Sequence, residues 1–329
     1  MCTAITYQTT EHYFGRNLDY DHSYGGEVVV LPRNYPLHYR AAAGSDRHYA
    51  IIGTALVQNN YPLFFDATNE KGLSMAGLNF VGNAFYFQPR AGVENVAPFE
   101  LIPWILSQCS SVNEARKLLG QMQLIDVPFS QEFPNAQLHW MLADRREAVT
   151  IESVAGGLQV YDNPVGVLTN NPRFDQQIFQ LNSYMHLTTE APRNTFAKGL
   201  DLRRYSLGMG ALGLPGDYSS TSRFVKAAFL KWNSQTGDTE EERVSQFFHI
   251  LGGVEQPRGL TLMENGNYEI TLYSSCCNTD RGIYYYRTYE NSEIVGVDMH
   301  LENLDGTELI VYPMEIMHEI QIQNAKKGV

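Results

Sequence analysis

The chain has 329 residues, of which 43% are hydrophobic and 18% are charged; this composition allows a large buried core and excludes a disordered protein. Its 24 basic and 36 acidic side chains give a formal net charge of −12, and an acidic chain without a basic cluster argues against a nucleic-acid partner. We find no apolar stretch of the 18 or more residues that a membrane helix needs, so we expect no membrane span and a cytoplasmic location.

The first predicted element is a β-hairpin at the N-terminus. Residues 2–7 and 12–16 read as two short strands that pair, so the chain returns to its own beginning. Arg16 and Asp19 would then lie beside Cys2. On their own, these two residues are more typical of an ordinary salt bridge.

Strand patterns dominate the rest of the chain. We predict strands over 49–57, 138–143, 148–153 and 158–161. Residues 261–263 and 268–273 flank Asn265-Gly266, a dipeptide that favours a tight hairpin turn. Further strands are predicted over 283–288 and 294–299.

Helices are fewer and have clear start signals. One begins near Pro98 and another follows the pattern Ser111-Val112-Asn113-Glu114, which is typical of a capping box. A third is predicted over about 222–232. A fourth follows Thr239 and its three glutamates, and ends at Gly252-Gly253. With no Pro/Gly/Ser-rich linker, the pattern indicates sheets covered by helices in one domain over residues 1–329.

Four cysteines, Cys2, Cys109, Cys276 and Cys277, are too few for a disulfide scaffold in a chain of this size. We interpret Cys109, Cys276 and Cys277 as core residues. The run Tyr284-Tyr285-Tyr286 is typical of sheet packing, with an assembly interface as the alternative. No metal-ligand spacing occurs among the cysteines and nine histidines, so we predict no metal and no other cofactor.

Cys2 is the strongest candidate for catalysis. Removal of Met1, the usual fate of an initiator before a small residue, leaves a thiol and a free α-amine on one residue. The thiolate is then the nucleophile, and the amine, with a pKa of about 7.7–8.0 in peptides, accepts and returns the proton. A cation beside the thiol favours its ionised form. If Met1 stays, this mechanism fails.

Several sequence blocks resemble the choloylglycine hydrolase family, which contains bile salt hydrolases and penicillin V acylases. These blocks are MCTAI with YFGRNLD at the start, NEKGL with AGLNF at 69–80, VLTNNP at 167–172 and GDYSSTSRFV at 216–225. They occur in family order over nearly the whole chain. The resemblance implies an N-terminal-nucleophile (Ntn) hydrolase: an α+β fold with two stacked, mainly antiparallel sheets between helix layers, an αββα sandwich.

The resemblance also implies the roles of individual residues. Cys2 matches the nucleophile, Arg16 the cation beside the thiol, and Asp19 the carboxylate near the α-amine. Asn170 matches the asparagine that donates to the oxyanion, and Asn79 a neighbouring position where penicillin acylase-like members tend to carry tyrosine. Arg223 matches an arginine that supports the site. Without the resemblance, Asn79 and Asn170 are also typical of strand ends and turns.

The implied reaction is hydrolysis of glycine- and taurine-conjugated bile salts through a Cys2 thioester. The steroid would need an apolar slot, and by analogy its walls are Leu18, Tyr20, Tyr24, Phe64, Phe65, Phe129 and Phe133, each of which is equally typical of plain core. Asn79 favours bile salts over penicillin V. The alternatives are a penicillin V or N-acyl-homoserine lactone acylase and a non-catalytic binding protein. The resemblance also implies a homotetramer.

Overall fold

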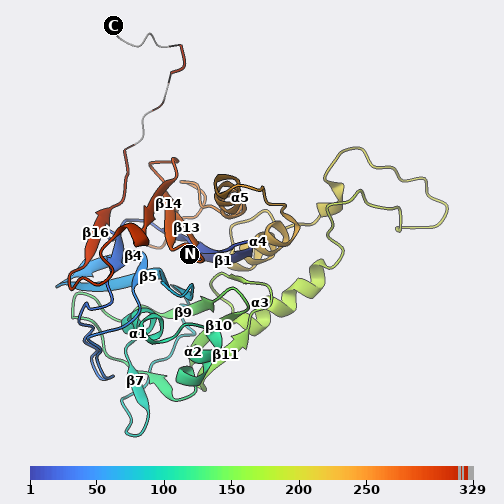
Figure 1. The fold of residues 1–329 in the computed structure, drawn as a ribbon. Coiled ribbons are helices and arrows are strands. Elements are labelled where there is room, and N and C mark those ends of the chain that lie inside the picture. The colour runs from blue at the N-terminus through green and yellow to red at the C-terminus, as the bar shows by residue number, and fades with distance from the viewer. Residues whose placement is uncertain (318–319, 321, 325–329) are drawn as a thin grey trace.

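Two antiparallel sheets are stacked face to face at the centre of the molecule, with helices on both outer sides (Figure 1). This computed structural model describes residues 1–317, 320 and 322–324. Helices α4 and α5 contact one sheet through β1 and β13, and α1 contacts the other through β5 and β6. The predicted α+β sandwich with two inner sheets is therefore confirmed.

The first sheet, here sheet A, contains the N-terminal strand at an inner position. Its order is β12-β1-β2-β13-β14-β15, and every neighbouring pair is antiparallel. The strands are β1 (Cys2–Gln8), β2 (His12–Tyr20), β12 (Val167–Leu168), β13 (Ile270–Asn278), β14 (Ile283–Thr288) and β15 (Val295–Asp298). The predicted hairpin is confirmed, with Cys2 opposite Leu18 and Gln8 opposite His12.

The second sheet, here sheet B, has eight strands in the order β11-β10-β9-β6-β5-β4-β3-β16. Their bounds are β3 (Glu27–Leu31), β4 (Ile51–Gln58), β5 (Tyr61–Asn69), β6 (Ser74–Asn79), β9 (Leu138–Ala143), β10 (Ala148–Val154), β11 (Gly157–Asp162) and β16 (Ile310–Pro313). A separate parallel pair consists of β7 (Glu94–Val96) and β8 (Met122–Leu124). The predicted strands over 49–57, 138–143, 148–153 and 158–161 correspond to β4, β9, β10 and β11.

The helices are α1 (Leu101–Gln108), α2 (Val112–Leu119), α3 (Phe174–Gln180), α4 (Ser220–Asn233) and α5 (Glu240–Gly252). Short 3-10 turns cover Pro98–Glu100, Leu181–Tyr184, Met209–Ala211 and Met299–Leu301. All four predicted helices are present. Between α3 and α4, a long segment leaves the body of the molecule as an arm (Figure 1, yellow).

A complete capping box, with both of its hydrogen bonds, begins α5, whereas α2 has only one of the two bonds. At α5, Thr239 accepts from the backbone N–H of Glu242, and the Glu242 carboxylate accepts from the backbone N–H of Thr239. At α2, Ser111 accepts from Glu114, but the Glu114 carboxylate turns to Ser110. The reciprocal bond of a complete box is missing there because Ser110 offers both its N–H and its hydroxyl.

Removing the α5 cap should destabilise the protein without affecting its site. We expect Thr239→Ala to lower the free energy of unfolding by about 1 kcal/mol, because the first turn of α5 loses a side-chain acceptor for its free N–H groups. Urea unfolding of both proteins measures the difference. Thr239→Ser, which keeps the hydroxyl, is the matched control and should lose much less.

One predicted hairpin was wrong in extent. The turn forms at Asn265-Gly266, with Gly266 at φ +84°, but only one isolated bridge joins Leu262 to Tyr268. The following strand, β13, begins at Ile270 and runs on to Asn278. The side chains of Asn265 and Asn267 instead bind Asp21, so this loop is tied to the end of β2.

The core contains the three remaining cysteines, as predicted. Cys276 and Cys277 are buried in β13, and Cys109 is buried directly after α1; all three are free thiols. Tyr284 and Tyr286 are also buried, which confirms sheet packing for those two tyrosines.

Candidate active site

The position of Cys2 follows from the N-terminal hairpin. Cys2 is the first residue of β1, 4% exposed, and it carries a free thiol. Because β1 lies between β12 and β2, residues from two other strands flank it. The turn of the hairpin returns Arg16, Leu18 and Asp19 to the level of Cys2, and all three line one cavity with it.

Arg16 lies between the two sheets. Its guanidinium Nη1 donates to the carbonyl oxygens of Phe65 (3.0 Å) and Gly77, on β5 and β6. Burial by itself lowers the pKa of the guanidinium, but nearby groups, led by Cys2, outweigh this effect and raise it. Arg16 is thus a permanently charged group held by sheet B beside the nucleophile.

Asp19 is buried beside the start of the chain. Its Oδ1 accepts from the Thr271 hydroxyl at 2.6 Å, whereas its buried Oδ2 accepts no hydrogen bond and lies 3.9 Å from Nη1 of Arg223. Burial raises the pKa of the Asp19 carboxyl. Oδ2 is therefore a buried acceptor close to the N-terminus and still free to bind a donor.

Arg223 and Asn170 hold the backbone of Cys2. The Arg223 guanidinium, from α4, donates to the Cys2 carbonyl oxygen at 2.5 Å and to Asn170 Oδ1 at 2.7 Å. Asn170 Oδ1 also accepts from the Cys2 nitrogen at 2.8 Å. Neither side chain lines the cavity; together they fix where the nitrogen of Cys2 lies.

Met1 is present in the chain and occupies the space in front of that nitrogen. Its amine donates to the Asp19 carbonyl oxygen at 2.9 Å and forms an ion pair with Glu269, and its carbonyl accepts from the Asp19 N–H at 2.9 Å. Burial lowers the pKa of the Met1 amine. With Met1 in place, the Cys2 nitrogen is an amide and cannot act as a base; its removal stays a prediction.

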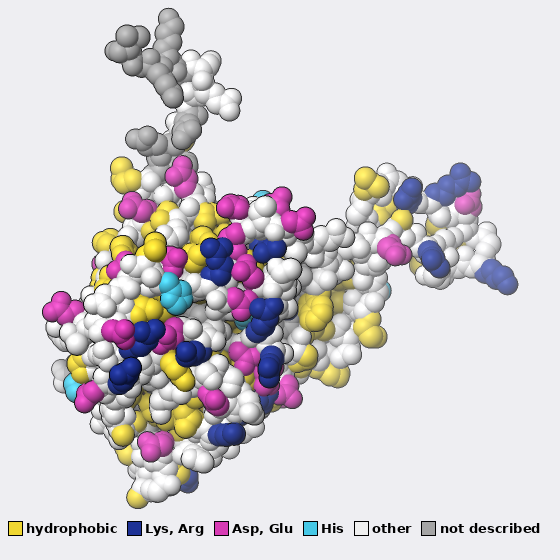
Figure 2. All heavy atoms as spheres, viewed as in Figure 1, with side chains coloured by type: hydrophobic (Ala, Val, Ile, Leu, Met, Phe, Trp, Pro, Cys, Tyr) yellow, Lys and Arg dark blue, Asp and Glu magenta, His cyan; other side chains and the backbone are white. Residues whose placement is uncertain are grey.

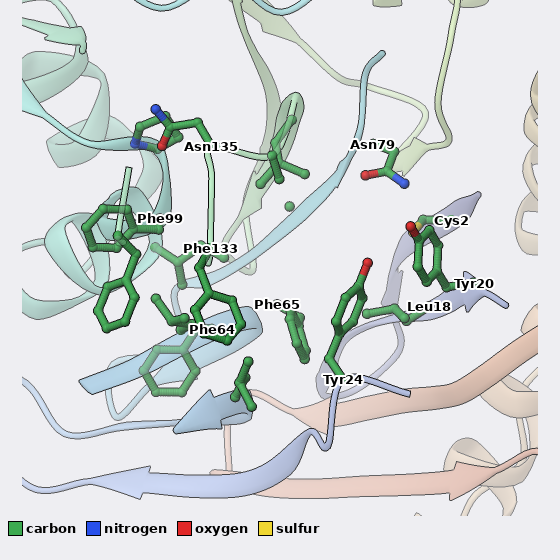
Figure 3. A pocket seen from close by; sticks show the side chains of 18 of the residues that line it. Cys2, Leu18, Tyr20, Tyr24, Phe64, Phe65, Asn79, Phe99, Phe133 and Asn135 are labelled. Carbon is green, nitrogen blue, oxygen red and sulfur yellow. The ribbon is translucent and has the colours of Figure 1, made fainter. Parts of the chain in front are cut away.

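Asn79 and Asn170 differ in how their carboxamides are used. The Asn170 Nδ2 donates to the backbone oxygen of Asn79 at 2.8 Å, so one of its two hydrogens is already bound. The Asn79 side chain, at the end of β6, lines the cavity with Cys2 (Figure 3). Of these two asparagines, only Asn79 lines the cavity that Cys2 also lines.

The cavity beside Cys2 is about 440 Å³ and mostly apolar. All seven predicted wall residues line it: Leu18, Tyr20, Tyr24, Phe64, Phe65, Phe129 and Phe133. In Figure 3, Cys2 and Asn79 lie at one end and Phe99 and Asn135 at the other. The roles of these residues remain predictions, but the structure brings all of them to one slot that ends at the thiol.

Several neighbours were missed by sequence reasoning. Phe99, Ile102 and Trp140 also line the cavity; the apolar pattern marked them only as core. Thr271 and Glu269 reach the N-terminus from β13 and the loop before it, and no local signal in the sequence singles them out. Within the described residues, we find no cluster of metal-ligating side chains and no helix long and apolar enough to cross a membrane.

Known proteins of one family match this chain over almost its whole length. Residues 2–312 match the profile of linear amide C–N hydrolases, choloylglycine hydrolase family. The chain is 56% identical to a bile salt hydrolase/transferase of Lactiplantibacillus plantarum, covering 95% of this chain and 97% of that protein. It is 36% identical to a bile salt hydrolase/transferase of Clostridium perfringens, covering 95% and 96%.

Solved structures agree with the fold. Variants of the conjugated bile acid hydrolase of Clostridium perfringens superpose with a TM-score of 0.90 at 35% identity, covering 98% of this chain and 100% of theirs. A penicillin V acylase of Agrobacterium tumefaciens superposes with a TM-score of 0.74 at 19% identity, covering 94% and 90%. At that identity the second match supports the fold alone.

Proposed function

Since this chain belongs to the choloylglycine hydrolase family of linear amide C–N hydrolases, we propose that it hydrolyses glycine- and taurine-conjugated bile salts. The observation that carries the proposal is the apolar slot that ends at Cys2. A steroid body fits an apolar slot, and its amide then lies at the thiol. The relatives' names, bile salt hydrolase/transferase, support the same substrate class.

The proposed reaction begins with attack of the Cys2 thiolate on the carbonyl carbon of the substrate amide. Arg16 stabilises the thiolate, and the oxyanion forms in front of Asn79. The α-amine of Cys2, free once Met1 is removed and held by Asn170 Oδ1, protonates the departing nitrogen. The C–N bond breaks, glycine or taurine leaves, and a thioester remains on Cys2.

In the second half, water attacks the thioester and gives its proton to the α-amine. The C–S bond breaks, releasing the free bile acid and leaving the Cys2 thiolate beside the α-ammonium, the state from which the reaction began. An amine that enters in place of water takes the acyl group instead. We include this transfer because the names of two relatives contain it.

The proposed role of Asn79 as the hydrogen-bond donor to the oxyanion predicts how its replacement changes kcat and KM. We expect Asn79→Ala to lower kcat by about 10²–10³-fold with little change in KM, because the amide stabilises charge that appears only in the transition state. Steady-state kinetics with glycocholate measures both constants. Asn135→Ala, at the other end of the slot, is the matched control; a large loss there and none at Asn79 would place the reacting carbonyl elsewhere.

The proposed function is tested with the purified protein, by measuring free glycine released from glycocholate and free taurine released from taurocholate. Penicillin V is assayed beside them. Hydrolysis of either conjugate supports the proposal, and turnover of penicillin V alone would replace it with the acylase alternative. The intact mass of the same sample shows whether Met1 is absent, as the mechanism requires.

We also propose that residues 1–329 act as one catalytic domain in a cytoplasmic homotetramer. Both sheets contribute walls to the slot, which supports a single domain. The four cysteines are free thiols, as expected in a reducing compartment such as the cytoplasm.

The support for the oligomer comes from the arm between α3 and α4, which exposes large apolar side chains with several basic ones (Figure 2). Phe196, Tyr205 and Leu207 are 82%, 83% and 90% exposed. Such a surface favours a protein contact, and light scattering measures the oligomer.

A further inference from the structure

A buried carboxylate, outside the slot, bridges the two sheets. Asp66, on β5, is 1% exposed. It accepts three hydrogen bonds, from the hydroxyls of Tyr273 (2.5 Å), Tyr284 (2.6 Å) and Ser275 (3.0 Å). Because an ionised carboxylate only accepts hydrogen bonds, three converging donors match the charged form. Asp66 does not line the slot, so its carboxylate does not contact a substrate bound there.

This carboxylate is connected to Arg16 in two ways. Ser275 Oγ bridges them, since it donates to Asp66 and accepts from the Arg16 backbone N–H at 3.2 Å. The residue before Asp66 is Phe65, whose carbonyl binds the guanidinium. The two charges also act on each other: burial raises the pKa of Asp66, and the Arg16 charge opposes this rise.

The two tyrosines act as fixed donors. Burial and the nearby Asp66 charge raise the pKa of Tyr273 and of Tyr284 far above the usual range, so both hydroxyls act as hydrogen-bond donors at neutral pH. The Tyr284 hydroxyl also contacts Thr54 Oγ1 at 2.7 Å. The network therefore joins β13 and β14 of sheet A to β4 and β5 of sheet B through one negative charge.

On this geometry, and building on the proposed function, we propose that Asp66 is a positioning residue for the reaction. Through Ser275 and the neighbouring Phe65, its carboxylate helps to hold Arg16 between the sheets, and its charge offsets part of the guanidinium charge, which limits how strongly Arg16 stabilises the Cys2 thiolate. Arg16 then has two buried counter-charges: Asp66, and the thiolate, which appears only when Cys2 ionises.

Other charges act on Cys2 as well, and they set the background for any titration. Those that face it are Arg16 and Asp19 of β2, Arg223 of α4, the N-terminal amine and the Tyr24 hydroxyl. None of these groups is itself replaced in Asp66→Asn. A shift in the ionisation of Cys2 would then report the loss of the Asp66 charge, together with any displacement of Arg16 that this loss causes.

The sign of the expected change in the alkylation midpoint follows from the lost charge, because the Arg16 guanidinium remains bound to the carbonyl oxygens of Phe65 and Gly77. In Asp66→Asn, Arg16 loses one of its counter-charges, and the Cys2 thiolate becomes more favourable relative to the thiol. We expect the pH midpoint of Cys2 alkylation by iodoacetamide to fall by at least about half a unit. We also expect kcat for glycocholate to fall about tenfold or more with KM little changed, because Arg16 is less well placed.

Thr68→Val is the matched control. It removes a buried hydrogen bond between β5 and β6, Thr68 to Ser74 at 2.7 Å, without removing a charge, so the alkylation midpoint should not move. Tyr284→Phe is a second variant in case Asp66→Asn does not fold. It removes one donor, raises the pKa of Asp66, and should shift the midpoint in the same direction by less.

A midpoint that stays constant or rises in Asp66→Asn, or in Tyr284→Phe where the first does not fold, overturns the proposal and leaves Asp66 a purely structural residue. Alkylation is followed on the N-terminal peptide by mass, so this readout needs no substrate. Failure of wild-type protein to hydrolyse either conjugate would therefore count against the proposed function and not against this role of Asp66.

Discussion

Replacing Cys2 by serine is expected to reduce hydrolysis of glycocholate and taurocholate by at least about a thousandfold in kcat. The hydroxyl is far less acidic than the thiol, so the cation at Arg16 cannot generate a useful fraction of the ionised nucleophile. The change is small in volume, and the hydrogen bonds of the Cys2 backbone to Asn170 and Arg223 do not depend on the sulfur. KM should stay within a few-fold of wild type.

Cys109→Ala serves as the control for Cys2→Ser. Cys109 is a buried free thiol outside the slot, so its loss should leave kcat unchanged while lowering stability. Both variants and the wild type need an intact-mass measurement, since retained Met1 would by itself abolish activity. Full activity in a Cys2→Ser protein that lacks Met1 would mean that another residue is the nucleophile.

Replacing Asp19 by asparagine should give the second large effect. Asp19 Oδ2 is buried and accepts no hydrogen bond. Burial lowers the pKa of the Met1 amine, and the Asp19 charge opposes this effect. Once Met1 is removed, the α-ammonium of Cys2 is the natural donor to this oxygen. Without the charge, less of the amine is protonated at neutral pH, so protonation of the leaving nitrogen slows. We expect kcat to fall by about 10²–10³-fold.

The pH profile separates this role from a structural one. The α-ammonium is the general acid, so a lower pKa should move the alkaline limb of kcat to lower pH in Asp19→Asn. Asp21→Asn is the control: Asp21 binds Asn265 and Asn267, outside the slot. A loss of kcat in Asp19→Asn with no change in the profile would assign Asp19 to structure only.

Local patterns were sufficient for much of the fold. Alternating apolar residues marked β9, β10 and β14, and capping residues marked the starts of α2 and α5, because these signals act over a few residues. Strands with weak alternation, such as β5 and β6, were not predicted as strands. β6 and the second half of β5 are buried on both faces; this burial is set by the sheet they enter, and it hides the period-two pattern.

The residues of the candidate site were likewise predicted in part from the sequence, and the rest were found only in the tertiary structure. The sequence by itself placed Cys2, Arg16 and Asp19 together, because a short hairpin brings them to one level, and family resemblance added Asn79, Asn170 and Arg223. Only the tertiary structure decided that Asn170 and Arg223 hold the Cys2 backbone while Asn79 lies in the slot. It also introduced Glu269, Thr271 and Asp66. These carboxylates and hydroxyls are distant in sequence, and their function depends on which strands pair across the sheets and between them, a long-range outcome that no local pattern encodes.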